Sequence, residues 1–321
     1  VTDDLDLCPN TDLSAALISS SGCKVDLFYK VSGFDNNQFT IKAIEAAEIG
    51  MEDELDGITY KIINQAQLID MVQDGDDLSY VVTSMITDMS SLFWGQYYDN
   101  GIFIEKVYIV GDISHWDVSN VSNMQKMFSG SYFNDEIEHW DVSNVTNMSG
   151  MFNASDFNEE IEDWDVSSVT NMSAMFANSK FNQEIGDWDV SNVTNMSFMF
   201  RDSDFNKFIG YWDVSNVTNM AWMFLNTKFS WNINFWDVSN VTDMSLMFRD
   251  SDFDGPIQDW DVSSVTNMSE MFMFGSFNQP IGDWDVSNVT NMTKMFRGKS
   301  SISTHPFDQD ISNWDVSNVT N

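Results

Sequence analysis

The chain has 321 residues, with 50 acidic and 14 basic side chains and a formal net charge of −36. Binding to nucleic acid and to anionic membrane surfaces depends on Lys and Arg, so this balance argues against both. No apolar run approaches the ~20 residues of a membrane span. The charge suits a basic partner or a cation, or it serves only to keep the chain soluble.

Residues 1–80 do not repeat, and we expect them to form a small α/β domain that caps the array after it. Residues 57–63 are typical of a strand, and residues 42–50 have a helix-like composition. Residues 65–72 are predicted to form a short helix with Asn64 as its N-cap. A cap is expected because the end of a stacked array offers unpaired backbone groups to any neighbour.

Cys8 and Cys23 lie close together near the start of the chain, which begins at Val1 without a signal peptide, as a mature or trimmed product would. In an extracellular chain the two would form a disulfide, worth roughly 3 kcal/mol in the chain-entropy model. The alternative is two free thiols in a reducing compartment. We favour the disulfide, because two cysteines lack the four ligands of a structural zinc site.

Residues 81–321 are organised by a nonapeptide that is cleanest at residues 188–196, WDVSNVTNM. Its tryptophan recurs in seven steps of 24 residues and one of 30. The repeat tryptophans are Trp116, Trp140, Trp164, Trp188, Trp212, Trp236, Trp260, Trp284 and Trp314. Such a period predicts a solenoid in which each coil buries its apolar face against its neighbours.

Within one coil, the first apolar positions fit the pattern of a leucine-rich repeat with a short strand over residues 188–191. The later ones have the spacing of one helical turn. The fold class we predict is therefore an α/β solenoid, leucine-rich-repeat-like, with one short strand and one short helical turn per 24-residue coil. The apolar positions are Ile185, Trp188, Val190, Val193, Met196, Met199, Phe200 and Phe205.

Units of the form FNQEIGDWDVSNVTNMSFMF resemble the repeats of the BspA-type leucine-rich-repeat surface proteins. The resemblance covers residues 81–321. It implies that the chain is secreted or surface-anchored, adhesive and not an enzyme, and it names no ligand.

The array departs from the regular rhythm in four places. It begins with a degenerate coil at residues 81–93, and an aromatic-rich insert at residues 94–110 either binds a partner or packs back on the cap. Regular coils occupy residues 111–296, six extra residues lie near 298–306, and an incomplete coil reaches residue 321. Because an open stacked end should aggregate, we expect a longer protein or a second chain to cover it.

An aspartate follows each repeat tryptophan. Stacked carboxylates about 4.8 Å apart repel by about 0.9 kcal/mol in water and about 3.5 kcal/mol at an effective dielectric of 20. Hydrogen bonds from the following Ser-Asn turn would offset this, and we favour them over calcium, the one candidate cofactor. Four coils add a second carboxylate, and these calcium candidates are Asp163 with Asp165, Asp187 with Asp189, Asp259 with Asp261 and Asp283 with Asp285.

The second asparagine of the motif forms a column broken only by Asp243, which we expect to be buried and to satisfy backbone groups of turns. The same residues create many N-glycosylation sequons, most of them accidents of the repeat, since glycans need exposed positions. Asn153 lies outside this column and is our first glycan candidate.

Two consecutive coils carry aromatic residues where their neighbours are polar. Tyr211 and Phe235 replace an aspartate and should stack on one face. Phe208, Trp222 and Trp231 complete the candidate binding face. Aromatic residues exposed on an acidic surface suggest contact with protein or carbohydrate, and the alternative is packing against a neighbouring copy.

Catalysis finds no support, because His115, His139 and His305 accompany no activated nucleophile or phosphate-binding loop. We predict a non-enzymatic adhesion or binding module, secreted or displayed at a cell surface. Its partner would be a protein, a carbohydrate or a copy of itself. The alternative is a structural subunit of an extracellular filament or coat.

Overall fold

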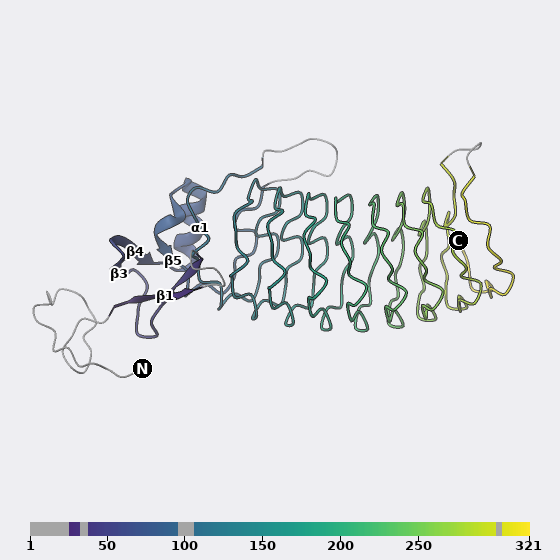
Figure 1. Ribbon diagram of the computed structural model, residues 1–321, viewed down its shortest axis with the longest axis horizontal. Coiled ribbons are helices and arrows are strands. Elements are labelled where there is room, and N and C mark those ends of the chain that lie inside the picture. Colours follow the sequence, from purple (N-terminus) through teal and green to yellow (C-terminus); the bar gives the residue numbers. More distant parts are fainter. Residues whose placement is uncertain (1–25, 33–37, 96–105, 300–303) are drawn as a thin grey trace, which may run out of the picture. The chain divides into compact units, whose positions relative to one another are not determined.

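The computed structural model describes residues 26–32, 38–95, 106–299 and 304–321. Two compact units are present (Figure 1). The N-terminal unit consists of Val1–Ile86 and Val110–Asn120, and the repeat array consists of Thr87–Ile109 and Val121–Asn321. The N-terminal unit thus extends past residue 80 and includes the first repeat tryptophan. Cys8 and Cys23 lie outside the described residues, so the disulfide stays a prediction.

The N-terminal unit contains two small sheets. The first pairs two antiparallel strands, β1 (Phe28–Ser32) and β2 (Phe39–Ala43). The second has the order β3-β4-β5, with the last two strands parallel: β3 (Glu52–Leu55), β4 (Ile58–Ile62) and β5 (Val81–Val82). The strand expected over residues 57–63 is confirmed. Residues 42–50 do not form a helix, because pairing with β1 draws their start into β2 and turns follow.

The helix expected after Asn64 is confirmed as α1 (Gln65–Asp74), which is followed by the short 3-10 helix η1 (Leu78–Tyr80). The Asn64 side chain accepts a hydrogen bond from the Gln67 N–H at 2.9 Å, and the Gln67 side chain accepts one from the Asn64 N–H at 3.0 Å. This reciprocal pair is a capping box, and it satisfies two backbone donors that the helix leaves free.

The first repeat motif is held inside the N-terminal unit. The Trp116 indole N–H lies 3.4 Å from the Leu78 carbonyl oxygen, and the His115 carbonyl accepts a hydrogen bond from the Ile41 N–H at 2.9 Å. The buried Asp117 carboxylate accepts a hydrogen bond from the Ser84 hydroxyl at 2.6 Å. The N-terminal unit therefore gives this segment the partners that a preceding coil gives to later ones.

In the repeat array, each 24-residue unit forms one coil, and successive coils stack (Figure 1). The apolar columns expected from the sequence are confirmed. In the coil of Trp188, all eight positions are buried. The Phe200 ring lies 4.0 Å from that of Phe205 and 5.8 Å from that of Phe224 in the next coil, with near-parallel planes. Each such pair adds about 0.5–1.5 kcal/mol beyond area burial.

Of the degenerate first coil predicted at residues 81–93, residues 87–93 belong to the repeat array, whereas residues 81–86 belong to the N-terminal unit. The Met89 N–H donates a hydrogen bond to the Asn123 carbonyl at 2.9 Å, and the rings of Phe93 and Phe128 stack at 5.6 Å. The described end of the insert packs on the array. Val107 bridges Ser131 there, while residues 96–105 of the insert lie outside the described residues.

The backbone of the coils differs from the expected strand and helical turn. Residues 188–191 form no strand, and the parallel bridges between coils lie instead at the second asparagine, where Asn195 pairs with Asn171 and Asn219. From residue 198 to 203, alternate N–H groups donate to the next coil and the others to a carbonyl three residues earlier. Because each direction takes only every second donor, the described coils contain neither a strand nor a helix.

Polar side chains of the motif join one coil to the coil before it. The Trp188 indole donates to the Ile161 carbonyl at 3.1 Å, and the Asn192 amide donates to the Ser167 carbonyl at 2.8 Å. The second asparagine, Asn195, accepts the N–H of its own turn, as expected, although it is half-buried where the sequence predicted burial. The constant motif is therefore a set of donors and acceptors for backbone groups.

Two residues in nearly every coil adopt the left-handed conformation, ten and fourteen positions after the tryptophan. In one coil these are Ala174 with φ 54° and Asn178 with φ 55°, whereas glycine takes the first of these positions at Gly150. A side chain costs about 1–2 kcal/mol in this conformation, and glycine avoids the cost. Most coils thus have a residue other than glycine at these two left-handed positions.

We expect Ala174→Gly to raise the free energy of unfolding by roughly 0.5–1 kcal/mol, which is unusual for a change to glycine. Removing the side chain relieves the left-handed conformation by more than the added entropy of the unfolded chain costs. Urea unfolding would measure the change. Ala177→Gly is the matched control, because Ala177 is buried and has no positive φ. A loss of stability in both variants would contradict the expectation.

Candidate functional site

The aromatic patch, which we define as Phe208, Tyr211, Trp231 and Phe235, lies on two consecutive coils. In each coil a turn joins the buried isoleucine to the buried tryptophan three residues later. The Trp212 N–H, for example, donates to the Ile209 carbonyl at 3.2 Å. This turn directs the residue before the tryptophan outward, so that Tyr211 is 82% and Phe235 is 77% exposed.

The rings of the aromatic patch meet edge to face. The Phe208 centroid lies 4.9 Å from that of Tyr211 at an interplanar angle of 82°, and 5.9 Å from that of Trp231 at 73°. The expected stacking of Tyr211 on Phe235 is wrong, since these two described side chains make no ring contact. Both side chains remain mostly exposed to solvent.

Trp231 occupies a position at which other coils carry glutamine. The Gln183 and Gln309 amides donate to a backbone carbonyl of the preceding coil, and the Trp231 indole donates in the same way to the Asn206 carbonyl at 3.1 Å. Gly255, which has no side chain, takes this position in the next coil. The substitution keeps the hydrogen bond and adds an indole that remains 45% exposed.

Gly210 makes room for the ring of Phe208, and the sequence analysis missed it. A Cβ atom on this residue would lie 2.7 Å and 2.8 Å from Cε2 and Cζ of Phe208, and 2.5 Å from the backbone oxygen of Asn232. Any side chain here would displace the ring or the next coil. Phe208, two residues before Gly210, is the one sequence signal that could have indicated this role.

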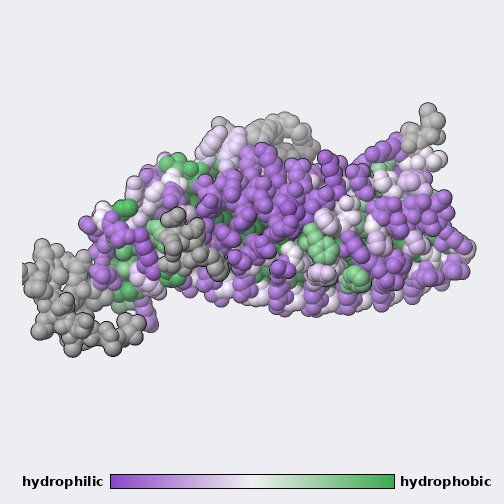
Figure 2. All heavy atoms as spheres, viewed as in Figure 1, coloured by the Kyte–Doolittle hydropathy of each residue, from purple (hydrophilic) through white to green (hydrophobic). Residues whose placement is uncertain are grey.

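Polar groups border the aromatic patch. Asn234 is buried, and its amide donates to the Asp259 carboxylate at 2.5 Å and accepts the Asp259 N–H at 3.2 Å. The position before the repeat tryptophan runs through four coils as Asp187, Tyr211, Phe235 and Asp259. Figure 2 shows hydrophobic side chains gathered over the middle coils of a largely hydrophilic face. Two open rings therefore lie between two carboxylates.

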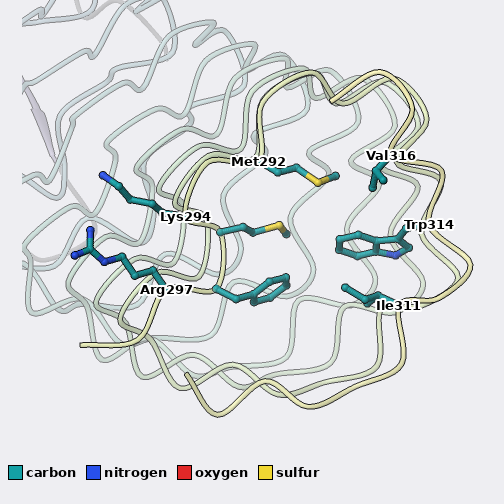
Figure 3. A pocket seen from close by; sticks show the side chains of 8 residues that line it. Met292, Lys294, Arg297, Ile311, Trp314 and Val316 are labelled. Carbon is teal, nitrogen blue, oxygen red and sulfur yellow. The ribbon is translucent and has the colours of Figure 1, made fainter. Parts of the chain in front are cut away.

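Trp222 lies on another surface. Its ring stacks on Phe198 at 5.3 Å, and the Arg201 guanidinium lies 5.5 Å from its centroid. Lys294 and Arg297 hold the equivalent positions in a later coil, and Figure 3 shows them pointing away from Trp314 of the coil that follows. The inclusion of Trp222 in the binding face was therefore wrong, because the left-handed turns carry it round the coil.

The hollow in Figure 3 has a volume of about 390 Å³. Its walls are residues of the apolar columns and of the turn beside them. Val316 is 50% exposed there, whereas its counterpart Val286 is 1% exposed between two coils. The hollow is thus the unstacked face of the core columns. It is lined by Met292, Lys294, Met295, Phe296, Arg297, Ile311, Trp314 and Val316.

Hydrogen bonds within each turn hold the aspartates after the tryptophans. The hydroxyl and the N–H of Ser191 donate to Asp189 and hold the pKa of that carboxyl below its ordinary value. Ser287 lowers the pKa of Asp285 through its hydroxyl and its N–H, and Ser317 lowers the pKa of Asp315 through its N–H and its hydroxyl. Among the described residues, no three metal-binding side chains lie together. Calcium binding at the four aspartate pairs stays a prediction.

We expect Ser191→Ala to raise the pKa of Asp189 toward its ordinary value, because only the backbone donor remains. The lowered pKa stabilises the folded chain above the unfolded value of about 3.9, and this contribution is lost as the pH falls through the folded value. The variant should thus lose part of it above about pH 4. Carboxyl NMR titration would measure the pKa, with Asp285 as internal control. An unchanged Asp189 pKa would contradict the assignment.

Asn153, the glycan candidate, is half-buried, and its side-chain oxygen accepts a hydrogen bond from the Asn178 amide at 3.3 Å. Its backbone carbonyl accepts the Gly130 N–H at 2.8 Å. A glycan on the amide nitrogen would have to leave through this contact region. Glycosylation at Asn153 stays a prediction.

Comparison with known proteins identifies a repeat family. The family model described as "Mycoplasma protein of unknown function, DUF285" matches the chain four times, at residues 64–180, 99–204, 172–274 and 251–321. The overlapping matches together span residues 64–321, and they confirm that the chain is built of repeats. No curated protein and no solved structure matches the chain. In the part of the chain that the structure describes, no helix has the length and apolar character needed to cross a bilayer.

Proposed function

This chain belongs to the DUF285 family, and on that premise we propose that it is a non-enzymatic binding module, secreted or displayed at a cell surface. The aromatic patch carries the proposal. Three of its rings are 45–82% exposed on a chain with a net charge of −36. A group of exposed aromatic side chains on a hydrophilic face is typical of a contact surface.

The fold does not require these aromatic residues. Neighbouring coils carry Asp187 and Asp259 at the position of Tyr211 and Phe235, and those coils stack in the same way. Burying an aromatic side chain yields about 1.5–3 kcal/mol, and the chain leaves this contribution unused at both residues. A partner that covers the rings would recover it.

We further propose that the array is a solenoid related to the BspA-type leucine-rich-repeat proteins. The 24-residue apolar columns and the parallel bridges between coils support this relation. The turns that replace the expected strand are a departure from the leucine-rich-repeat pattern. A surface or secreted location follows from the same relation and remains part of the proposal.

Surface plasmon resonance would test the binding function. The probes are a layer of mannan, which is a neutral polysaccharide, and a layer of unglycosylated albumin. We expect wild-type chain to bind at least one layer, and the double variant Tyr211→Asp, Phe235→Asp to bind it at least about 30-fold more weakly, as two contacts of about 1 kcal/mol each imply. Asp163→Ala with Asp283→Ala alters the same position in other coils and should leave binding unchanged.

Two results would count against the proposal: equal binding by wild type and the aromatic variant, or no binding to either layer. Size-exclusion chromatography of the same samples examines the structural alternative. If wild type forms oligomers that the aromatic variant does not form, the patch joins copies of the chain, and a subunit of a filament or coat becomes the better description.

A further inference from the structure

We propose that the aromatic patch binds neutral carbohydrate, with sugar rings lying across Tyr211 and Phe235. The inference rests on the proposed function and names the ligand class of the same site. It is carried by the size of the patch, the exposure of its rings and the polar groups at its edge.

The size of the patch favours a glycan over a folded protein. Tyr211, Phe235 and Trp231 are 82%, 77% and 45% exposed. Together these fractions correspond to roughly 400 Å² of surface, at about 200 Å² for each aromatic side chain. A stable protein interface covers about 800 Å² on each partner and needs an apolar centre. Acidic side chains border this patch instead, so its apolar area suits a few sugar rings.

The Tyr211 and Phe235 rings are mostly exposed and make no contact with each other. The backbones that carry them belong to successive coils, roughly 5 Å apart by the spacing of paired chains. The C–H bonds on one face of a pyranose pack against an aromatic ring, so two neighbouring sugars can each cover one side chain.

Trp231 and Phe208 form the wall beside these two rings. The Trp231 indole N–H is already bonded to the Asn206 carbonyl, so the ring is fixed by the coil and offers only apolar surface. Phe208 meets the rings of Tyr211 and Trp231 edge to face. Since Gly210 supplies the space in which Phe208 lies, the wall exists before any ligand arrives. Such preorganisation lowers the entropy cost of binding.

Polar acceptors lie where sugar hydroxyls would emerge. Asp187 and Asp259 are exposed at the two ends of the column that contains Tyr211 and Phe235. The amide of Asn234 holds the Asp259 carboxylate in place at 2.5 Å. A carboxylate has about four acceptor sites, so Asp259 retains capacity for ligand hydroxyls.

The charge of the site selects neutral sugars. The flanking carboxylates and the net charge of −36 would repel uronic acids, sulfated sugars and phosphorylated glycans. Hydroxyl groups donate hydrogen bonds to carboxylates without this repulsion. The ligand class is therefore an uncharged oligosaccharide or polysaccharide of at least two sugar residues.

Affinity electrophoresis of the full chain tests the inference. The gels contain hydroxyethyl cellulose, mannan or galactan as neutral polysaccharides, and alginate as an acidic one. We expect at least one neutral polysaccharide to retard wild type, and Tyr211→Ala to raise its dissociation constant at least tenfold. Phe235→Tyr, which keeps an open ring, should retain binding. Asn313→Ala is the matched control, because it alters the position before another repeat tryptophan without a change of charge, and it should migrate as wild type does.

Several results would overturn the carbohydrate assignment. These are no retardation by any of the three neutral polysaccharides, equal retardation of Tyr211→Ala, or stronger retardation by alginate. The binding function can survive this failure. If the aromatic double variant loses binding to albumin while all neutral gels leave wild type unretarded, the patch binds protein, and only the carbohydrate inference falls.

Discussion

Replacing Phe224 by alanine is expected to lower the free energy of unfolding by about 3–5 kcal/mol. Phe224 is fully buried, and its ring lies 4.3 Å from Phe229 in the turn that follows it. It also stacks on Phe200 at 5.8 Å and on Phe248 at 5.7 Å, in the coils on either side. Because coil-to-coil hydrogen bonds fix the backbone, the cavity cannot collapse. Urea unfolding followed by circular dichroism would measure the loss.

Phe235→Ala is the matched control for this experiment, since it removes the same side chain one coil further along. Phe235 is 77% exposed, so the change should alter stability by less than about 0.5 kcal/mol. The two variants together separate the aromatic residues that build the array from those that its surface displays. Similar losses in both would show that the placement of one of them is wrong.

A deletion of 24 residues, 171–194, is expected to leave the array folded, whereas a deletion of 23 residues, 171–193, should destabilise it by on the order of 5 kcal/mol. The first joins Thr170 to Asn195 and restores an intact motif, so every column stays aligned. The second leaves one extra residue between Thr170 and Asn195. That residue displaces the donors and the buried methionine that join one coil to the next.

The chain itself shows where extra residues are tolerated. Six additional residues follow Phe296, and beyond them the Trp314 indole still donates to the Ile281 carbonyl at 3.0 Å, and the Thr320 N–H donates to the Thr290 carbonyl at 2.9 Å. The loop before the next coil therefore absorbs an insertion, and the hydrogen-bonded segment should not. Limited proteolysis and urea unfolding would compare the stability of the two deletion variants. Equal stability of the two would contradict the register argument.

The aromatic patch could be foreseen in part. Four of its proposed residues, Phe208, Tyr211, Trp231 and Phe235, lie on two consecutive coils. They could be predicted because a residue that breaks the repeat marks a position at which the fold does not require one residue type. Trp222 does not join them, since the side of the coil that it occupies depends on the left-handed turns after the tryptophan. The residues with positive φ in those turns are mostly not glycine, so their residue types did not predict the left-handed conformation.

The sequence by itself determined the period of the array, its buried columns, the capped helix α1 and the hydrogen bonds that the Asp and the second Asn of the motif accept in their own turns. These features repeat or act over a few residues, so spacing and residue type suffice to reveal them. Only the tertiary structure decided that the coils are joined through alternating turns and not through strands. An N–H group there can donate to a carbonyl three residues earlier or to a carbonyl of the next coil, and the stacked arrangement of the coils determines which bond forms. The role of Asn234 likewise appears only when two coils meet, since Asp259 lies on the neighbouring coil, and the role of Gly210 depends on where the Phe208 ring and the Asn232 carbonyl come to lie.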